Sequence, residues 1–338
     1  MSTEVSSAHP VEQGNMTSSV KWMHIIVFIV LTFGISWGIW LSLSALGVPF
    51  GTPVGRGMYG IGMFGPALAA LLVRLLRREG FADAGLRLVG RGQRGGAWMY
   101  LAAYLVIPLV LAAGIGLALL TGVQHWAFSQ NLHQLGQTQV AALASQGQRL
   151  PAGETADQLA LSTILTQSLL AFTLAIPFNM IFTFGEEFGW RGYLLPRLAP
   201  MGGVPAAIMT GVVWGVWHAP LIVLYGYNYR GHPLLGVGMM VVSAVALGMI
   251  FAWLRFRSGS VWPSVLAHAA INGQAGFALI FLSAADSLVK APIGVIGLIP
   301  MLAFASWLAV SGRLRPEPKH APAPTHVQAE ASPTLNEC

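Results

Sequence analysis

The chain has 338 residues, of which only 9% are charged, 18 being Lys or Arg and 12 being Asp or Glu. That share excludes an ordinary soluble globular domain, in which about 25% of the residues are charged. Hydrophobic residues make up 55% of the chain, so the formal net charge of +6 indicates basic loops of a membrane protein and no nucleic-acid partner.

Eight apolar segments follow one another along the chain, each long enough to cross a hydrocarbon core of roughly 30 Å as a helix. They lie near 25–46, 58–76, 98–120, 164–195, 204–225, 236–254, 261–283 and 288–310. The pattern predicts an all-α, polytopic integral membrane protein with about eight transmembrane helices, within a region that spans 22–312.

The basic residues, counted on alternate sides of these spans, predict that both termini are cytoplasmic. In that orientation 14 of the 18 basic residues face the cytoplasm, and those facing outward are Arg56, Arg149, Arg230 and Lys290. Because Lys and Arg collect in cytoplasmic loops, the bias supports both the span count and the orientation. We expect a bacterial-type plasma membrane.

Three polar stretches lie outside the expected spans. Residues 1–21 and 313–338 are expected to be disordered tails, and the second is rich in Pro, Ala and polar residues that cannot bury enough apolar surface. The connection 121–163 is long and rich in Gln and Ser, and the count places it outside. The sequence leaves its helical content open.

Ionisable side chains inside the spans are few, and each is costly enough to indicate function. Of the 12 acidic residues, only Glu186 and Glu187 lie within an apolar segment. Of the nine histidines, only His218 and His268 lie deep inside one. These four residues are therefore the first candidates for a site.

The acidic pair lies in the fourth span, close to Arg191. Glu187 and Arg191 are spaced i,i+4 and should pair on one helix face, whereas Glu186 is rotated about 100° away. A carboxylate beside a second one, in apolar surroundings, suits a general base. The alternative is a structural ion pair at the membrane interface.

The histidines lie on two later spans. His218 precedes Pro220, which has no backbone N–H and clashes with the carbonyl of Val216, so the helix should bend and free a carbonyl near the histidine. His268 and Asn272 are spaced i,i+4 and share one helix face. Each of these polar groups could instead bridge neighbouring helices.

Together these four side-chain groups favour a hydrolase. A carboxylate, two imidazoles and an amide, carried by three helices, can activate water and stabilise an oxyanion. His268 should lie about 10 Å below the cytosolic start of its helix, with Glu186 at a similar depth and His218 about a turn deeper. We therefore expect one pocket that opens toward the cytosol.

Three motifs, in this order, resemble those of the CPBP family of intramembrane metalloproteases, also called the Abi or CAAX-protease family, which includes type II CAAX endopeptidases. The family pattern is Glu-Glu-x-x-x-Arg, then aromatic-x-x-x-His, then His-x-x-x-Asn. The matching segments are Glu186–Arg191, Trp214–His218 and His268–Asn272.

The resemblance implies an endopeptidase with the site residues Glu186, Glu187, Arg191, His218, His268 and Asn272. Glu186 would be the base that activates water. Family members that process prenylated CAAX proteins remove a C-terminal tripeptide at the cytosolic face. A peptide or protein partner is therefore expected. One option is that the protein processes the C-terminus of a lipidated or membrane-associated protein. Membrane lipid is expected to surround it.

The residues leave open whether a divalent metal such as zinc takes part. Glu186, His218 and His268 would form a reasonable zinc triad with a fourth position for water. The single-helix HExxH signature of many zinc peptidases does not occur in the sequence.

Two other functions remain as alternatives. One is a proton-coupled membrane transporter, in which the acids and histidines form a proton relay. The other is a non-catalytic scaffold or bacteriocin-immunity protein, since bacterial relatives in the family have been connected with immunity. A transporter should carry ionisable groups across the whole membrane thickness, in contrast to one cluster.

Overall fold

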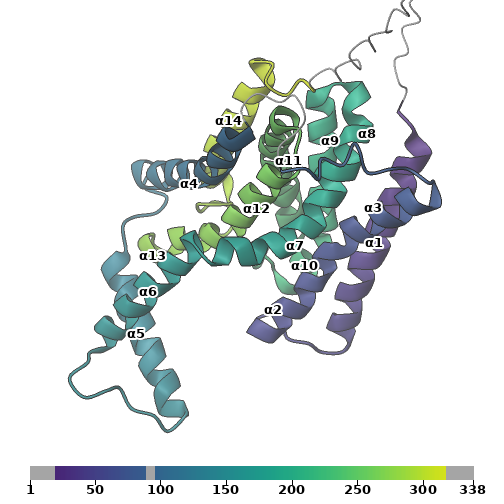
Figure 1. Cartoon of the computed structure of the whole chain (residues 1–338). Helices are drawn as coiled ribbons and strands as arrows, with labels where there is room; N and C mark the ends of the chain where they lie inside the picture. Colours follow the sequence, from purple (N-terminus) through teal and green to yellow (C-terminus); the bar gives the residue numbers. More distant parts are fainter. Residues whose placement is uncertain (1–19, 89–95, 317–338) are drawn as a thin grey trace, which may run out of the picture.

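The computed structural model describes residues 20–88 and 96–316, and every regular element in these ranges is a helix (Figure 1). The predicted all-α class is confirmed. The predicted tails, 1–21 and 313–338, lie outside the described residues except at 20–21 and 313–316.

The first part of the chain forms α1 (Trp22–Ala45), α2 (Pro53–Gly60), the 3₁₀ turn η1 (Ile61–Phe64), α3 (Gly65–Leu76), α4 (Gly96–Leu120), α5 (Phe128–Ser145) and α6 (Ala156–Phe172). The middle part forms α7 (Ala175–Gly189), the π-helical turn η2 (Trp190–Leu194), α8 (Leu195–Leu198), η3 (Ala199–Met201), α9 (Gly203–Trp217) and α10 (Ala219–Tyr225). The last part forms α11 (Pro233–Ser258), α12 (Trp262–Gln274), η4 (Ala275–Phe277), α13 (Ala278–Phe281) and α14 (Val295–Val310).

Six helical stretches of the described chain are long and apolar enough to cross a membrane. A seventh results if α6 and the stretch Ala175–Met201, which meet at a bend of 48°, form one span. The eighth predicted span, 288–310, corresponds to α14, whose 16 residues fall short of that length. The helices thus follow the predicted segments, with six or seven full-length spans.

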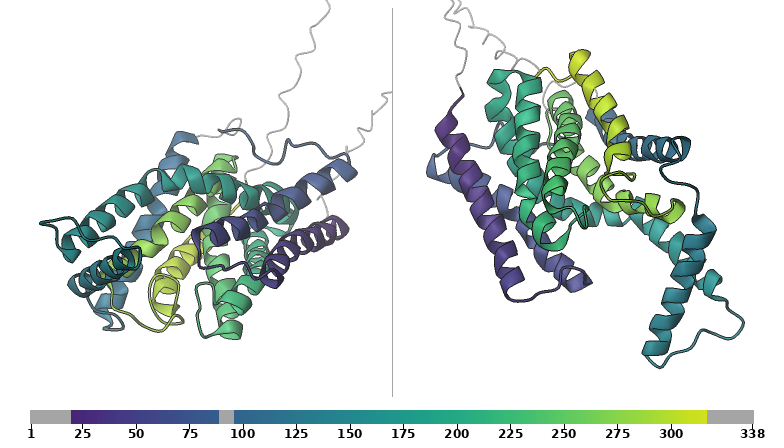
Figure 2. Two further views of the ribbon diagram at one scale, coloured as in Figure 1. Left: turned by 90° about the horizontal axis from the view of Figure 1, so that it is seen from below. Right: turned by 180° about the vertical axis from the view of Figure 1, so that it is seen from behind.

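The connection 121–163 is largely helical. Its α5 packs against α6 as a hairpin that projects from the rest of the molecule (Figure 1 and Figure 2). The start of α6 is fixed by Thr155, whose side chain accepts from the Gln158 backbone N–H while the Gln158 side chain accepts from the Thr155 N–H. This reciprocal cap stabilises the start of a helix.

Pairs of glycines hold the two helices that carry the first and second motifs tightly against their neighbours. On α9, a Cβ added to Gly211 would lie 2.6 Å from the Cα of Val245 on α11. On α7, a Cβ added to Gly185 would lie 2.8 Å from a carbonyl oxygen of η1. A second glycine follows four residues later in each helix, Gly215 and Gly189, and this spacing lets membrane helices approach backbone to backbone.

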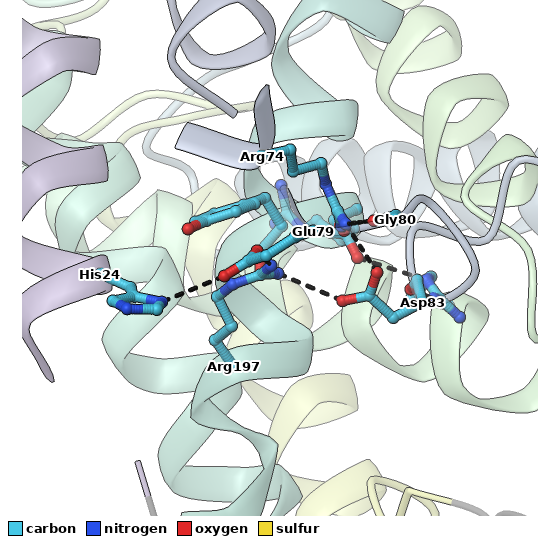
Figure 3. Close-up of polar contacts among 10 residues, drawn as sticks. His24, Arg74, Glu79, Gly80, Asp83 and Arg197 are labelled. Atoms are coloured by element: carbon cyan, nitrogen blue, oxygen red, sulfur yellow. Dashed lines mark hydrogen bonds and ion pairs between the residues drawn. The ribbon is translucent and has the colours of Figure 1, made fainter. Parts of the chain in front are cut away.

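The helices share two ends with different chemistry. At the first, the arginine end, the start of α1, the end of α3, the loop 77–88, α8 and the end of α11 come together. Figure 3 shows its ionic network, in which His24 Nδ1 and Glu79 Oε1 lie 3.1 Å apart and Arg197 contacts both Glu79 and Asp83. Asp83 Oδ1 also accepts from Arg74 Nη1 at 2.7 Å.

The second end, the cavity end, is formed by the connections 46–52, 226–232 and 282–294 together with α2. Phe50 stacks on Tyr225 with 5.2 Å between ring centres, and the hydroxyl groups of Tyr59 and Tyr225 are in contact. Ser287 Oγ donates to the Arg230 carbonyl at 3.2 Å. Phe50 also lies edge-on to Tyr227, with 6.0 Å between ring centres, so side-chain contacts join the first two connections near α2 and the second to the third.

Candidate active site

Glu187 is the centre of a buried ion pair that also orients His268. Its Oε1 accepts from Arg191 Nη1 at 2.8 Å and from His268 Nδ1 at 2.9 Å. Both Glu187 and Arg191 are fully buried, and the guanidinium lies 4.8 Å from the ring centre of Trp214, where a cation–π contact stabilises it. The predicted pairing of Glu187 with Arg191 is confirmed.

Glu186 takes no part in that ion pair and is held by two indole groups. Its Oε2 accepts from Trp214 Nε1 at 2.6 Å and from Trp190 Nε1 at 3.3 Å. Trp190 lies one turn further along the chain and Trp214 comes from α9, so the carboxylate is fixed by two elements. Oε1 has no hydrogen-bond partner within 20–88 and 96–316.

His218 lies at the interruption between α9 and α10, as the proline predicts. Its backbone N–H donates to Gly215 O at 3.2 Å, one residue short of the α-helical partner. The carbonyl of Trp214 is thereby released, and it accepts from His218 Nδ1 at 2.9 Å. The freed carbonyl that accepts from His218 is thus that of Trp214. The clash with Pro220 had instead indicated the carbonyl of Val216.

The two imidazole rings use the same nitrogen, Nδ1, for hydrogen bonds within the protein. Each uses Nδ1 as a donor, His218 to a carbonyl and His268 to a carboxylate, which leaves Nε2 of each ring as the nitrogen for chemistry. His218 is 9% exposed and His268 4% exposed, whereas Asn272, one turn beyond His268 on α12, is exposed.

Two cavities meet at these side chains. Glu186, His218, His268 and Asn272 all line the smaller one, of about 190 Å³. The larger one, of about 520 Å³, is lined by the same two histidines and Asn272 without Glu186. The structure therefore brings the four polar groups of the predicted site together, whereas Glu187 and Arg191 line neither of the two cavities.

Both cavities reach toward the cavity end. Phe50 and Arg56 line the smaller one, and Asn228 and Lys290 line the larger one. The described chain termini lie at the arginine end, where His24 meets Glu79 and the segment near Leu314 packs on the start of α9. Cytoplasmic termini and a pocket that opens to the cytosol stay predictions.

The π-helical turn η2 overlaps the end of the acidic motif, and two arginines from other helices support it. Pro196 has no N–H, so it cannot donate to Gly192 O in α-helical spacing or to Arg191 O in π-helical spacing. Arg74 Nη2 donates to the Gly192 carbonyl at 3.0 Å, and Arg255 Nε donates to the Arg191 carbonyl at 3.2 Å. These long-range bonds satisfy two carbonyls that the proline leaves without a helical partner.

Sequence reasoning missed the indole donors to Glu186 and the two arginines that support η2. The signal for Trp190 was present, because it is spaced i,i+4 from Glu186 on the same helix. The positions of Arg74 and Arg255 carry no such signal, since their carbonyl partners are 118 and 64 residues away in the chain.

The free Nε2 atoms are donors of the type that zinc binds in proteins. Within the described residues, however, no group of three or more His, Cys, Asp or Glu side chains is arranged to hold a metal ion.

The fold and the site define a helical membrane protein that carries the three motifs on α7–η2, α9 and α12. Residues 162–274 match the family model described as type II CAAX prenyl endopeptidase Rce1-like, and all six predicted site residues fall within the match. A curated relative from Methanococcus maripaludis, named CAAX prenyl protease 2, is 29% identical over 92 residues. That alignment covers 26% of this chain and 34% of the archaeal protein.

These matches confirm the resemblance to the CAAX-protease family that the three motifs predicted. Together with the apolar helices they identify the chain as an integral membrane protein. Because the chain matches only about a third of the curated relative's length, the activity, the substrate and the partners are matters of proposal.

Proposed function

We propose that this protein is an intramembrane endopeptidase in which Glu186 activates a water molecule. The observation that carries the proposal is the convergence of Glu186, His218, His268 and Asn272, from three helices, on one cavity. The match to an endopeptidase family over the same residues supports it.

In the first step, Glu186 accepts a proton from a water molecule that lies between it and His218. The two indole donors fix Oε2 and leave Oε1 to take the proton. His218 Nε2 is an acceptor while Nδ1–H donates to Trp214 O, so it can hold the second hydrogen of the same water. The hydroxide then attacks the peptide carbonyl carbon.

In the second step, the oxyanion that forms on the carbonyl is stabilised by donors on α12. Asn272 offers its amide N–H groups, and His268 donates from Nε2 when its ring carries both protons. Glu187 accepts from Nδ1 of that ring and holds it in place. Glu186 returns its proton to the leaving amine, the C–N bond breaks and the proton balance closes.

The proposed substrate is a peptide segment of a membrane-associated protein. The name of the archaeal relative suggests that this protein could be lipid-modified. The larger cavity supports an apolar group beside the peptide, because Met240, Leu247 and Ile271 contribute to its lining. Membrane lipid surrounds the helices.

A divalent metal such as zinc, with Glu186, His218 and His268 as ligands, stays a prediction. Metal analysis of the purified wild-type protein beside His218→Ala tests it. An ion that is present in stoichiometric amount in the wild type and lost in the variant would support those ligands. A bacterial-type plasma membrane and cytoplasmic termini also stay predictions.

The transporter alternative receives little support. Its proton relay should extend through the membrane, whereas Glu186, Glu187, His218 and His268 gather around one site. Uptake into liposomes by a protein that cleaves no peptide would favour it.

The test of the proposal is cleavage of labelled peptides by purified protein in detergent, comparing wild type with Glu186→Gln. We expect the variant to lose about 10²–10⁴-fold in turnover, the usual contribution of a general base, while its thermal unfolding stays close to that of the wild type. Glu154→Gln, on an exposed turn, is the matched control and should retain activity. Full turnover by Glu186→Gln would remove the base assignment.

A further inference from the structure

Four side chains of the described residues line both cavities, and they mark the junction at which the two cavities meet. They are His218, Tyr227, His268 and Asn272. Three of them belong to the motifs, whereas Tyr227 belongs to none and lies in the connection 226–232, after the end of α10. The structure thus adds one side chain to the place where the motif residues gather.

The chain after α10 holds the Tyr227 ring beside His218. Gly226 ends the helix with a φ of +64°, a left-handed conformation that glycine adopts without strain. Tyr227 N–H then donates to the Leu221 carbonyl at 3.2 Å. The ring of Tyr227 lies nearly parallel to that of His218, with 3° between the planes and 6.2 Å between the centres. Tyr227 is therefore placed next to the imidazole that the proposed mechanism uses.

Three neighbouring tyrosines use their hydroxyl groups within the protein, and Tyr227 differs from them. The hydroxyl groups of Tyr59 and Tyr225 are in contact with each other. The Tyr229 hydroxyl donates to the Ile293 carbonyl at 3.1 Å. In the described part of the chain, no backbone carbonyl and no carboxylate accepts a hydrogen bond from Tyr227. Its hydroxyl is therefore available at the cavity junction.

The Tyr227 hydroxyl keeps a hydrogen to donate. A phenol is protonated at neutral pH even in its ordinary state. Burial and the negative charge of Glu186 raise the pKa of the Tyr227 phenol, and together they outweigh the hydrogen bond from the Asn228 amide. Because that amide can donate to the phenol oxygen, the O–H group can point at a ligand in the cavity. Tyr227 therefore serves as a donor at neutral pH and not as a base.

A donor at this junction has a chemical use in the proposed reaction. The carbonyl oxygen of the substrate gains a negative charge when water attacks, and in a site surrounded by apolar side chains protein donors must stabilise it. His218 is occupied with the water, and His268 can donate from Nε2 only while its ring carries both protons. A neutral hydroxyl needs no such extra proton, so Tyr227 complements the amide of Asn272.

We infer that Tyr227 is a further catalytic residue, whose hydroxyl donates a hydrogen bond to the substrate's carbonyl oxygen as that oxygen becomes an oxyanion. The inference rests on the proposed peptidase function and adds a donor to Asn272 and His268. Its basis is the place that Tyr227 shares with three motif residues at the cavity junction. The proton stays on the phenol oxygen throughout, so the proton balance of the reaction is unchanged.

Tyr227→Phe tests the donor, because it keeps the ring beside His218 and removes only the hydroxyl. With purified protein in detergent and a labelled peptide, we expect kcat to fall by about 10²–10³-fold, the usual effect of losing one oxyanion donor, while KM changes by less than about threefold. Thermal unfolding should match that of the wild type. Tyr225→Phe is the matched control and should retain kcat, since it removes a hydroxyl from a residue that lines neither cavity.

Binding of a phosphinic peptide provides a second measurement, because its tetrahedral anionic group imitates the intermediate. Tyr227→Phe should raise the Kd of this peptide at least about tenfold, whereas Tyr225→Phe should leave it unchanged. An equal Kd for wild type and Tyr227→Phe would overturn the donor role.

The kinetic outcomes separate this inference from the proposed function. Full turnover by Tyr227→Phe would overturn the donor role, and loss of activity in Tyr227→Ala alone would then leave the ring with the task of positioning His218. A raised KM with unchanged kcat would also overturn it. In these cases the wild type still cleaves and Glu186→Gln does not, so the proposed function stands. A wild type that cleaves no peptide would contradict the proposed function, and the role of Tyr227 with it.

Discussion

The arginine end and the cavity end both bury polar groups, but they use them differently. At the arginine end, Arg74 and Arg255 donate to backbone carbonyls of η2 and of the loop 77–88. Around the cavities, which reach toward the cavity end, the Nε2 atoms of His218 and His268 have no protein acceptor or donor in the described ranges.

A buried ionisable group does not by itself mark a site. Arg74 is as buried as the groups around Glu186, being 1% exposed, yet its donors complete a helix that a proline interrupts. What distinguishes the site is a polar atom left without a protein partner and facing a cavity. Glu187 stands between the two cases, since it belongs to a structural ion pair and also holds His268.

The largest expected effect is on stability, and it concerns Glu187. Glu187→Gln leaves Arg191 as an uncompensated buried charge and should destabilise the protein by about 3–5 kcal/mol. Unfolding in detergent, followed by heat or denaturant, measures it. The double variant Glu187→Leu/Arg191→Met should regain most of that stability but stay inactive, because His268 loses its acceptor. A double variant as unstable as Glu187→Gln would contradict the ion-pair account.

A smaller effect is expected at Arg255, which we assign as a positioning residue. Arg255→Ala removes donors from the carbonyls of Arg191 and Asp83, and hydrogen bonds to a charged group contribute about 1.5–3 kcal/mol each. We expect lower stability, with kcat reduced and KM little changed, because Arg191, which pairs with Glu187, lies in η2.

Arg255→Lys sharpens that prediction. It keeps the charge but not the planar fork that serves two carbonyls, so it should recover only part of the stability and of kcat. A KM that rises while kcat is unchanged would instead place Arg255 in substrate binding.

The smallest effect is a pH dependence at the arginine end. Burial acts to raise the pKa of Asp83, but the hydrogen bond from Arg74 and the charges of Arg74 and Arg197 outweigh it and hold the pKa below its ordinary value. A lowered folded pKa stabilises the protein above the unfolded pKa, and this stability is lost as the pH falls through the folded pKa. Asp83 is partly exposed, so we expect less than about 1 kcal/mol after solvent screening.

The measurement is unfolding as a function of pH below about 5. Wild type should lose stability more steeply than Asp83→Asn, and Glu154→Gln, on the exposed turn before α6, should follow the wild type. Parallel curves for wild type and Asp83→Asn would show that the ion pairs with Arg74 and Arg197 do not contribute to stability.

Much of the helical layout could be predicted from the sequence. Hydropathy located the spans, and the i,i+4 spacing predicted that Glu187 pairs with Arg191 and that His268 and Asn272 share a face. These features depend on one helix at a time. The 48° bend between α6 and the stretch Ala175–Met201 escaped prediction, because the apolar segment 164–195 reads as continuous.

The amino-acid order alone thus determined which groups are buried in the membrane and which neighbours they meet along their own helix, because both follow from local periodicity and apolar content. Only the tertiary structure decided that Glu186, His218, His268 and Asn272 line one cavity. That outcome depends on how α7 packs against α12 and on how the indole of Trp214, on α9, reaches Glu186. Contacts between residues far apart in the chain leave no periodic trace in the sequence.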